Sequence, residues 1–261
     1  MRLISKIDFS DKVYLVPLGD IHLGSRGIDI PKLKGYIDWI QKTTSAYTFL
    51  MGDIFDVATL GSPTNPHYQK MNLNEAIRFA YELFNPIKDR ILGSVSGNHE
   101  ERLERYAGFN PLQAFSESIG IPYAGYSAVL RFRIGQYKRK SGLTSPNVEY
   151  VFFIHHGTGG GSTLGGKLNR AVKLEDVFEG ADAYLVGHNH AKALGEQYVA
   201  YLSKSGNGKA TIQYKRKAYV DCGAFLTYDD SYAEMGALAP SDTGAVRLRM
   251  NGTRKDLHIS F

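Results

Sequence analysis

Five short polar blocks, each directly after an apolar run of the kind that forms β-strands, constrain the fold of this chain more than any other feature. They are Asp20-Ile21-His22, Gly52-Asp53-Ile54-Phe55-Asp56, Gly97-Asn98-His99-Glu100, His155-His156-Gly157 and Gly187-His188-Asn189-His190. Ligand sites of α/β proteins usually lie at the sheet edge where the carboxyl ends of the strands meet. We therefore expect an α/β fold that brings all five blocks together into one site.

The apolar pattern between the blocks alternates between the spacing of strands and that of helices. Apolar runs predict strands at Val13–Leu18, Tyr47–Met51, Ile91–Ser96, Val148–Ile154 and Ala183–Val186. Helical spacing and end signals predict helices over Pro31–Thr43, along the stripe Leu73, Ile77, Ala80, Phe84 and Ile87, and from Asn110-Pro111 to Gly120.

From Ser127 onward the spacing changes to period two, with Leu130, Phe132 and Ile134 predicted to face the core. After Glu196 the sequence is typical of β-hairpins, with a turn at Gly206-Asn207-Gly208 and final strands at Val246–Met250 and Leu257–Phe261. We find no internal repeat and no linker, so we predict one domain over residues 1–261 with a sheet-rich C-terminal part.

The charge balance favours anionic partners, because the formal net charge is +5 and the sequence pI is about 9.1. Two basic groups stand out: Arg131, Arg133, Lys138, Arg139 and Lys140, and then Lys215, Arg216 and Lys217. For both groups a solvated face of a strand or hairpin is favoured over a phosphate-binding patch. Apolar runs are too short to span a bilayer, so no membrane partner is expected. The lone cysteine, Cys222, fits the cytoplasm.

The donor types of the five blocks indicate a metal site. Residues i and i+2 of an extended segment point the same way, so Asp20 and His22 can clamp one ion. His188 and His190 can do the same. Carboxylate, imidazole and amide donors together suit Mn²⁺, Fe²⁺, Zn²⁺ or Ni²⁺ better than Ca²⁺. A carboxylate between two such ions can bridge them at about 3.5–4 Å, a separation that supports in-line displacement at phosphorus.

The five blocks resemble the motifs of the calcineurin-like metallophosphoesterases: D-x-H, G-D-x-x-D, G-N-H-[DE], H-G and G-H-x-H, in this order. The resemblance is close over Val13–His190 and loose over Tyr219–Phe225, and it extends to phage and bacterial members similar to DNA-repair exonucleases. It implies a four-layer α-β-β-α sandwich in which two mixed β-sheets are flanked by helices. It also implies two divalent metal ions, with Mn²⁺ the first choice and Fe, Zn or Ni as alternatives.

The resemblance also implies a role for each matching residue. One ion would be held by Asp20, His22 and His190, the second by Asn98, His156 and His188, and both by the bridging carboxylate of Asp53. In this family His99 corresponds to the histidine that faces the substrate and either protonates the leaving group or steadies the phosphate. Asp56 corresponds to the carboxylate that orients that histidine.

Several other residues keep two interpretations. His155 is interpreted as a supporting or buried side chain, because neighbouring strand residues face opposite ways. The glycine-rich loop 157–170, with Gly159–Gly161, Gly165, Gly166, Lys167 and Arg170, fits either an anion-binding loop or a flexible connection. His67 fits a substrate entrance or, more ordinarily, an exposed loop. Glu100, Arg102 and Arg105 are interpreted as solvated charges on a helix or turn.

Two observations bear on the substrate: a departure from the phosphoprotein phosphatase motif and the positive net charge of the chain. Phosphoprotein phosphatases of this family follow the second aspartate with Arg-Gly, whereas Val57-Ala58 follows Asp56 here. The basic balance favours a phosphodiesterase that acts on nucleotides or nucleic acid. The alternatives are a phosphomonoesterase for a small nucleotide or sugar phosphate and a non-catalytic protein-binding scaffold. The presence of His99 disfavours the scaffold, and the sequence does not predict an oligomeric state.

Overall fold

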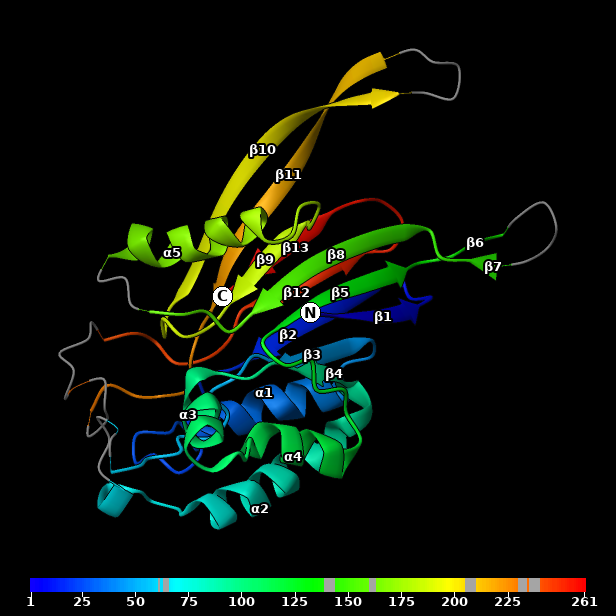
Figure 1. Cartoon of the computed structure of the whole chain (residues 1–261). Helices are drawn as coiled ribbons and strands as arrows, with labels where there is room; N and C mark the ends of the chain where they lie inside the picture. The colour runs from blue at the N-terminus through cyan, green and yellow to red at the C-terminus, as the bar shows by residue number, and fades with distance from the viewer. Residues whose placement is uncertain are drawn as a thin grey trace.

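Two β-sheets packed face to face, with helices on both outer sides, make up the protein (Figure 1). The computed structural model describes residues 1–60, 62, 66–138, 144–159, 163–204, 210–229, 234 and 240–261. The six-stranded sheet has the order β1 (Arg2–Asp8), β5 (Ser127–Ile134), β8 (Val148–His155), β9 (Ala183–Val186), β11 (Ala210–Cys222) and β10 (Lys192–Lys204). The five-stranded sheet has the order β13 (Leu257–Ser260), β12 (Arg247–Asn251), β2 (Lys12–Leu18), β3 (Ala46–Leu50) and β4 (Ile91–Ser94).

Both sheets contain parallel and antiparallel pairs. In the five-stranded sheet β2, β3 and β4 run parallel, whereas β12 and β13 join them antiparallel. In the six-stranded sheet β8, β9 and β11 run parallel, whereas β5 and β10 are antiparallel to their neighbours β8 and β11. A small ribbon of β6 (Tyr137–Lys138) and β7 (Thr144–Ser145) extends from β5. The predicted four-layer sandwich of two mixed sheets is therefore confirmed.

Three apolar layers hold the sandwich together. The inner faces of the two sheets enclose the largest, which includes Leu15, Phe49, Phe132, Phe152 and Leu248. A second layer lies between the five-stranded sheet and the helices α1 (Ile30–Lys42), α2 (Leu73–Phe84), α3 (Asn98–Ala107) and α4 (Pro111–Ile119). A third lies between the six-stranded sheet and α5 (Leu164–Lys173), which covers its outer face in Figure 1.

Helix ends follow the local signals of the sequence. The Asn110 side chain accepts hydrogen bonds from the N–H groups of Leu112 and Gln113, and Gly120 ends α4 with φ +76°. One prediction is wrong in extent, because α2 ends at Phe84 and Ile87 lies in the 3₁₀ segment η2 (Asn85–Arg90). Pro86 has no N–H to continue the α-helical bonds, so the helix stops there although Ile87 stays buried.

The described chain also contains two short 3₁₀ segments, η1 (Pro66–Tyr68) and η3 (Leu174–Asp176). The strand β1 has no counterpart in the sequence prediction. The hairpin of β10 and β11 is confirmed, while its predicted turn at 206–208 lies outside the described residues. Because β2, β3 and β4 are parallel in one sheet, and β8 and β9 in the other, the five polar blocks follow the same ends of these strands.

Candidate metal centre

The backbone of the polar blocks adopts a conformation that L-residues rarely accept. Residues of the three short loops that follow β2, β3 and β9 have φ between +47° and +69°: Asp20, His22, Asp53, His188 and His190. Such left-handed residues are uncommon outside glycine and persist where the surrounding structure fixes them. Here the loops fix one another, since the N–H groups of Ile21 and His22 both donate to the carbonyl oxygen of Asp53.

The first cluster consists of Asp20, His22 and His190. The two Nε2 atoms of His22 and His190 lie 3.1 Å apart, and Nε2 of His190 lies 3.4 Å from Oδ1 of Asp20. Oδ1 of Asp20 is fully buried and accepts no hydrogen bond from any described residue. Buried polar atoms usually have a partner. A carboxylate oxygen and two imidazole nitrogens that converge in this way fit a divalent cation.

The second cluster consists of Asp53, Asn98, His156 and His188. Oδ1 of Asn98 lies 2.7 Å from Nδ1 of His188 and 3.2 Å from Nε2 of His156. Nδ1 of His156 hydrogen-bonds the carbonyl oxygen of Met51 at 2.8 Å. That bond keeps a proton on Nδ1 and directs Nε2 toward the cluster, where it can bind a cation once it gives up its own proton. The two oxygens and two nitrogens fit a second cation.

Asp53 connects the two clusters. Its Oδ2 atom lies 3.2 Å from Nε2 of His156, 3.9 Å from Nε2 of His99 and 4.0 Å from Nε2 of His22. Burial alone would raise the pKa of this carboxyl, but the neighbouring His156 and His99 hold it well below its usual value. Asp53 is thus a carboxylate with one oxygen directed at donors of both clusters, as a bridging ligand requires.

Electrostatics distinguish the histidines of the centre. Burial opposes the charged form of His156, but the carboxylate of Asp53 outweighs it and raises the pKa of His156 to about 10. Burial and the neighbouring His156 lower the pKa of His188 to about 4. His188 is therefore neutral at pH 7 and can donate a lone pair to a cation.

His99 and Asp56 lie together beside the clusters. Nδ1 of His99 hydrogen-bonds the main-chain carbonyl oxygen of Asp56 and lies 3.3 Å from its carboxylate oxygen Oδ1. Nε2 of His99 thus faces Asp53. The same Oδ1 lies 3.2 Å from Nδ1 of His22, and Oδ2 accepts a hydrogen bond from Gln69 at 2.8 Å. Asp56 therefore contacts His22 as well as His99, the histidine that the resemblance implies it orients.

Glu100 corrects the prediction of solvated charges. Its side chain is fully buried, and its two oxygens accept hydrogen bonds from the N–H groups of Asp53, Ile54, Phe55 and Gly97 at 2.7–3.0 Å. The carboxylate therefore holds the loop that carries Asp53. Gly97 completes this packing, because a Cβ atom there would lie 2.1 Å from Oδ1 of Asp53.

The remaining predicted residues lie around the centre or away from it. Nδ1 of His155 accepts a hydrogen bond from the N–H of Gly157 at 2.8 Å, which confirms a supporting role. Nζ of Lys167 donates to the carbonyl oxygen of Asn189, so α5 reaches the His188–His190 loop. Residues 160–162 of the glycine-rich segment lie outside the described residues. His67 is exposed in η1.

Most of the described side chains of the two basic groups pair with carboxylates. Arg139, Lys140 and the side chain of Lys138 lie outside the described part of the chain. Arg131 pairs with Glu149 and Arg216 with Glu196 at the surface, as solvated strand faces do. Lys217 is an exception, because it is buried and pairs with Glu175. For this residue the prediction of a solvated face is wrong. The reason is that its side chain points toward the segment after α5 rather than into water.

Comparison with known proteins identifies the class. A family model described as calcineurin-like phosphoesterase matches residues 15–192. The chain therefore belongs to the calcineurin-like phosphoesterase family, and it is a metal-dependent phosphoester hydrolase whose substrates are phosphate esters. None of the described helices is both long enough and apolar enough to cross a membrane.

Solved structures with a similar fold have low sequence identity. GAP50, the anchor in the inner membrane complex of Plasmodium, is 11% identical with a TM-score of 0.45, over 93% of this chain and 82% of that chain. The Haemophilus influenzae NAD nucleotidase NadN is 9% identical with a TM-score of 0.38, over 96% and 49%. Chaetomium thermophilum Vps29 is 14% identical with a TM-score of 0.34, over 80% and 99%. No curated protein sequence matches the chain.

Proposed function

We propose that this hydrolase is a phosphodiesterase that acts on nucleotides or nucleic acid, as a single domain over residues 1–261 in the cytoplasm. The observation that best supports hydrolysis of a phosphate ester is the position of Asp53. Its Oδ2 atom faces imidazole nitrogens of both clusters at 3.2–4.0 Å. Two divalent ions, Mn²⁺ before Fe, Zn or Ni, fit the mixture of carboxylate, amide and imidazole donors.

The seven residues of the two clusters would divide into ligands of two metal ions. Asp20, His22 and His190 would hold one ion, Asn98, His156 and His188 would hold the other, and Asp53 would be shared by both. When bound, the ions polarise the phosphate and stabilise the charge on the attacking and leaving oxygens.

His99 would give a proton to the leaving oxygen from Nε2. The hydrogen bond from Nδ1 to the carbonyl oxygen of Asp56 supports this role, because it keeps the other ring nitrogen directed into the centre. Burial opposes the charged form of His99, but Asp53 and Asp56 raise its pKa to about 9. The ring therefore holds its proton at neutral pH, as an acid must.

Charge and the shape of the site support a diester substrate. The net charge of +5 favours polyanions. A cavity of about 290 Å³ lies beside the loop after Asp56 and is lined by Leu23, Val57, Ala58 and Met71, among others. This cavity offers room for the organic part of a substrate along the loop that follows Asp56.

The experiment compares turnover of p-nitrophenyl phosphate, bis-p-nitrophenyl phosphate and single-stranded DNA with added Mn²⁺. A phosphodiesterase turns over the diester and the DNA faster than the monoester. Faster turnover of the monoester would favour the alternative, a phosphomonoesterase for a small nucleotide or sugar phosphate. Absence of turnover of all three with Mn²⁺, Fe²⁺, Zn²⁺ and Ni²⁺ would contradict both.

A further inference from the structure

A second pocket lies away from the metal centre, where the hairpin of β10 and β11 leaves the six-stranded sheet. Strand β11 pairs with β9 only from Ala218 to Asp221, so its earlier part extends beyond the sheet with β10 (Figure 1). The cavity at this position has a volume of about 660 Å³. Its lining includes Tyr150, near the start of β8. The end of this strand at His155 leads to the metal centre, about 17 Å away along the strand.

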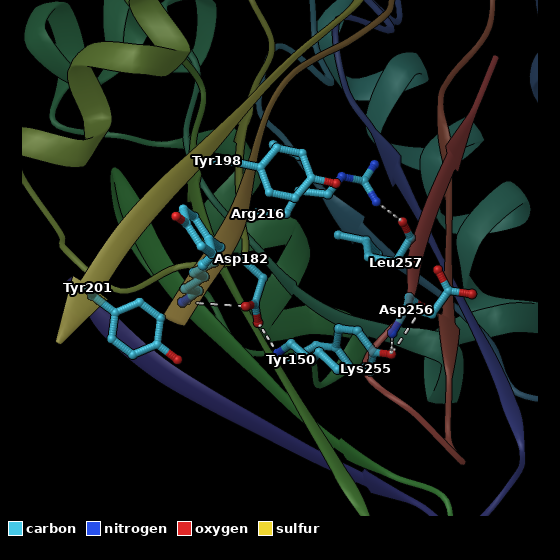
Figure 2. A pocket seen from close by; sticks show the side chains of 11 residues that line it. Tyr150, Asp182, Tyr198, Tyr201, Arg216, Lys255, Asp256 and Leu257 are labelled. Atoms are coloured by element: carbon cyan, nitrogen blue, oxygen red, sulfur yellow. Dashed lines mark hydrogen bonds and ion pairs between the residues drawn. The ribbon is translucent and has the colours of Figure 1, made fainter. Parts of the chain in front are cut away.

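Tyrosine side chains form much of the pocket wall. Tyr198, Tyr201 and Tyr214 of the hairpin line it together with Tyr150, and Figure 2 shows Tyr198, Tyr201 and Tyr150 around one hollow. The exposed fractions of Tyr198 and Tyr214 are 68% and 72%. Large aromatic rings that remain this exposed are available for stacking against a flat ligand.

The charges of the pocket leave an excess of cations. Nζ of Lys255 lies 2.6 Å and Nζ of Lys215 lies 3.4 Å from oxygens of the same carboxylate, that of Asp182. Asp256 and Arg216 also line the pocket, and they pair with Arg254 and Glu196. Among these groups the four cations, Lys215, Arg216, Arg254 and Lys255, exceed the three carboxylates by one positive charge. Lys255 also lies over the ring of Tyr150, at 4.5 Å from its centroid, so a cation and an aromatic ring occupy adjacent positions.

We propose that this pocket binds a nucleotide, with the base stacked on the exposed tyrosines and the phosphate at Lys215 and Lys255. Rings that stack on any base, next to cations that follow the phosphates, are the combination used to bind single-stranded nucleic acid. The cavity volume is within the range of small-ligand sites. The nucleotide is either free or a unit of a strand. This site is separate from the metal centre and is not required for hydrolysis there.

The test measures binding of two probes, adenosine monophosphate by calorimetry and a fluorescent phosphorothioate oligothymidylate by anisotropy. Tyr214→Ala should weaken binding about 5- to 100-fold, as expected when a stacked base loses its aromatic partner. Tyr214→Phe keeps the ring and should bind like the wild type. Tyr81→Ala is the control, because Tyr81 is an exposed tyrosine on α2 at the opposite side of the sandwich. Preferential binding of the oligonucleotide identifies a strand, and preferential binding of the monophosphate identifies a free nucleotide.

Two results would overturn the nucleotide site. One is binding by Tyr214→Ala within a factor of about two of the wild type, for both probes. The other is a change from dimer to monomer in Tyr214→Ala with unchanged binding, which would make the hairpin a contact between two copies of the chain. Turnover of bis-p-nitrophenyl phosphate separates this inference from the proposed function. Turnover of this substrate should be the same in Tyr214→Ala, Tyr214→Phe, Tyr81→Ala and the wild type. If the wild type does not turn it over, the proposed phosphodiesterase function is contradicted, but the nucleotide site is not.

Discussion

At the residue scale, the role of His99 follows from the atoms around its ring. Nδ1 is held at the Asp56 carbonyl oxygen, so only Nε2 is available to the substrate. We expect His99→Ala to lower kcat about 10²- to 10⁴-fold, the usual contribution of a general acid or base, and to retain both metal ions. Steady-state kinetics with bis-p-nitrophenyl phosphate and metal analysis of the same sample measure this. His258→Ala, a surface change on β13, is the control. Unchanged kcat would refute the acid role.

The pH dependence of the reaction tests the partnership of His99 with Asp56. Burial alone lowers the pKa of His99, whereas Asp53 and Asp56 raise it to about 9. The acid form is present below this value and is lost as the pH rises through it. We therefore expect kcat to fall near pH 9. Asp56→Asn removes one of the two negative charges, so the fall should move to lower pH. A pH profile that is identical in the two proteins would mean that Asp56 does not control His99.

At the element scale, Glu100 attaches α3 to the loop after β3. Its buried carboxylate accepts four main-chain hydrogen bonds, three of them from Asp53, Ile54 and Phe55. In Glu100→Gln an amide NH₂ replaces one acceptor and faces these donors. We expect the free energy of unfolding to fall by about 2–4 kcal/mol, since each buried donor left unpaired costs about 1–3 kcal/mol.

Urea denaturation measures this loss of stability. The matched control is Glu101→Gln, because Glu101 is the next residue of the same helix and pairs with Arg105 near the surface. Surface pairs of this kind contribute less than about 1 kcal/mol. Equal stability losses in the two variants would show that the main-chain hydrogen bonds of Glu100 are not what stabilises the loop.

Elements with strong local signals were predictable from the sequence. Apolar runs mark the buried strands, and Asn110 and Gly120 mark both ends of α4. The edge strand β1 was missed because it has no buried residue, and its Leu3 is 64% exposed, so no apolar pattern marks it. Glu100 was misjudged because its partners are main-chain N–H groups about 45 residues earlier. Nearly every residue has a main-chain N–H group, so the sequence does not show which of these groups will bind a given carboxylate.

The residues that meet in the two clusters were more predictable from the sequence than the residues that support them, for a physical reason. A ligand must be a carboxylate, imidazole or amide at a strand end, so residue type and position select it. Supports such as Gln69, which donates to Asp56, have no such restriction. The backbone strain is also poorly predicted from the sequence. His188 and His190 have a positive φ, which histidine adopts more often than most residues but still uncommonly.

At the scale of the whole molecule, the metal centre joins the two sheets. Asp20, His22 and Asp53 follow strands of the five-stranded sheet, whereas His156 and His188 follow strands of the six-stranded sheet. Ions held by both groups would bind the folded chain and not the unfolded one. Their binding free energy therefore adds to the stability of the whole sandwich.

Thermal unfolding with and without Mn²⁺ measures this contribution. A ligand at about one hundred times its Kd adds about 2.7 kcal/mol, which corresponds to roughly 5–10 °C in Tm for a chain of this size. Asp53→Asn removes the carboxylate shared by the two clusters, so we expect it to lose most of the rise. Asp38→Asn makes the same chemical change on the exposed face of α1 and should keep the full rise. An equal rise in both variants would show that Asp53 does not hold the ions, and that the two sheets are joined without it.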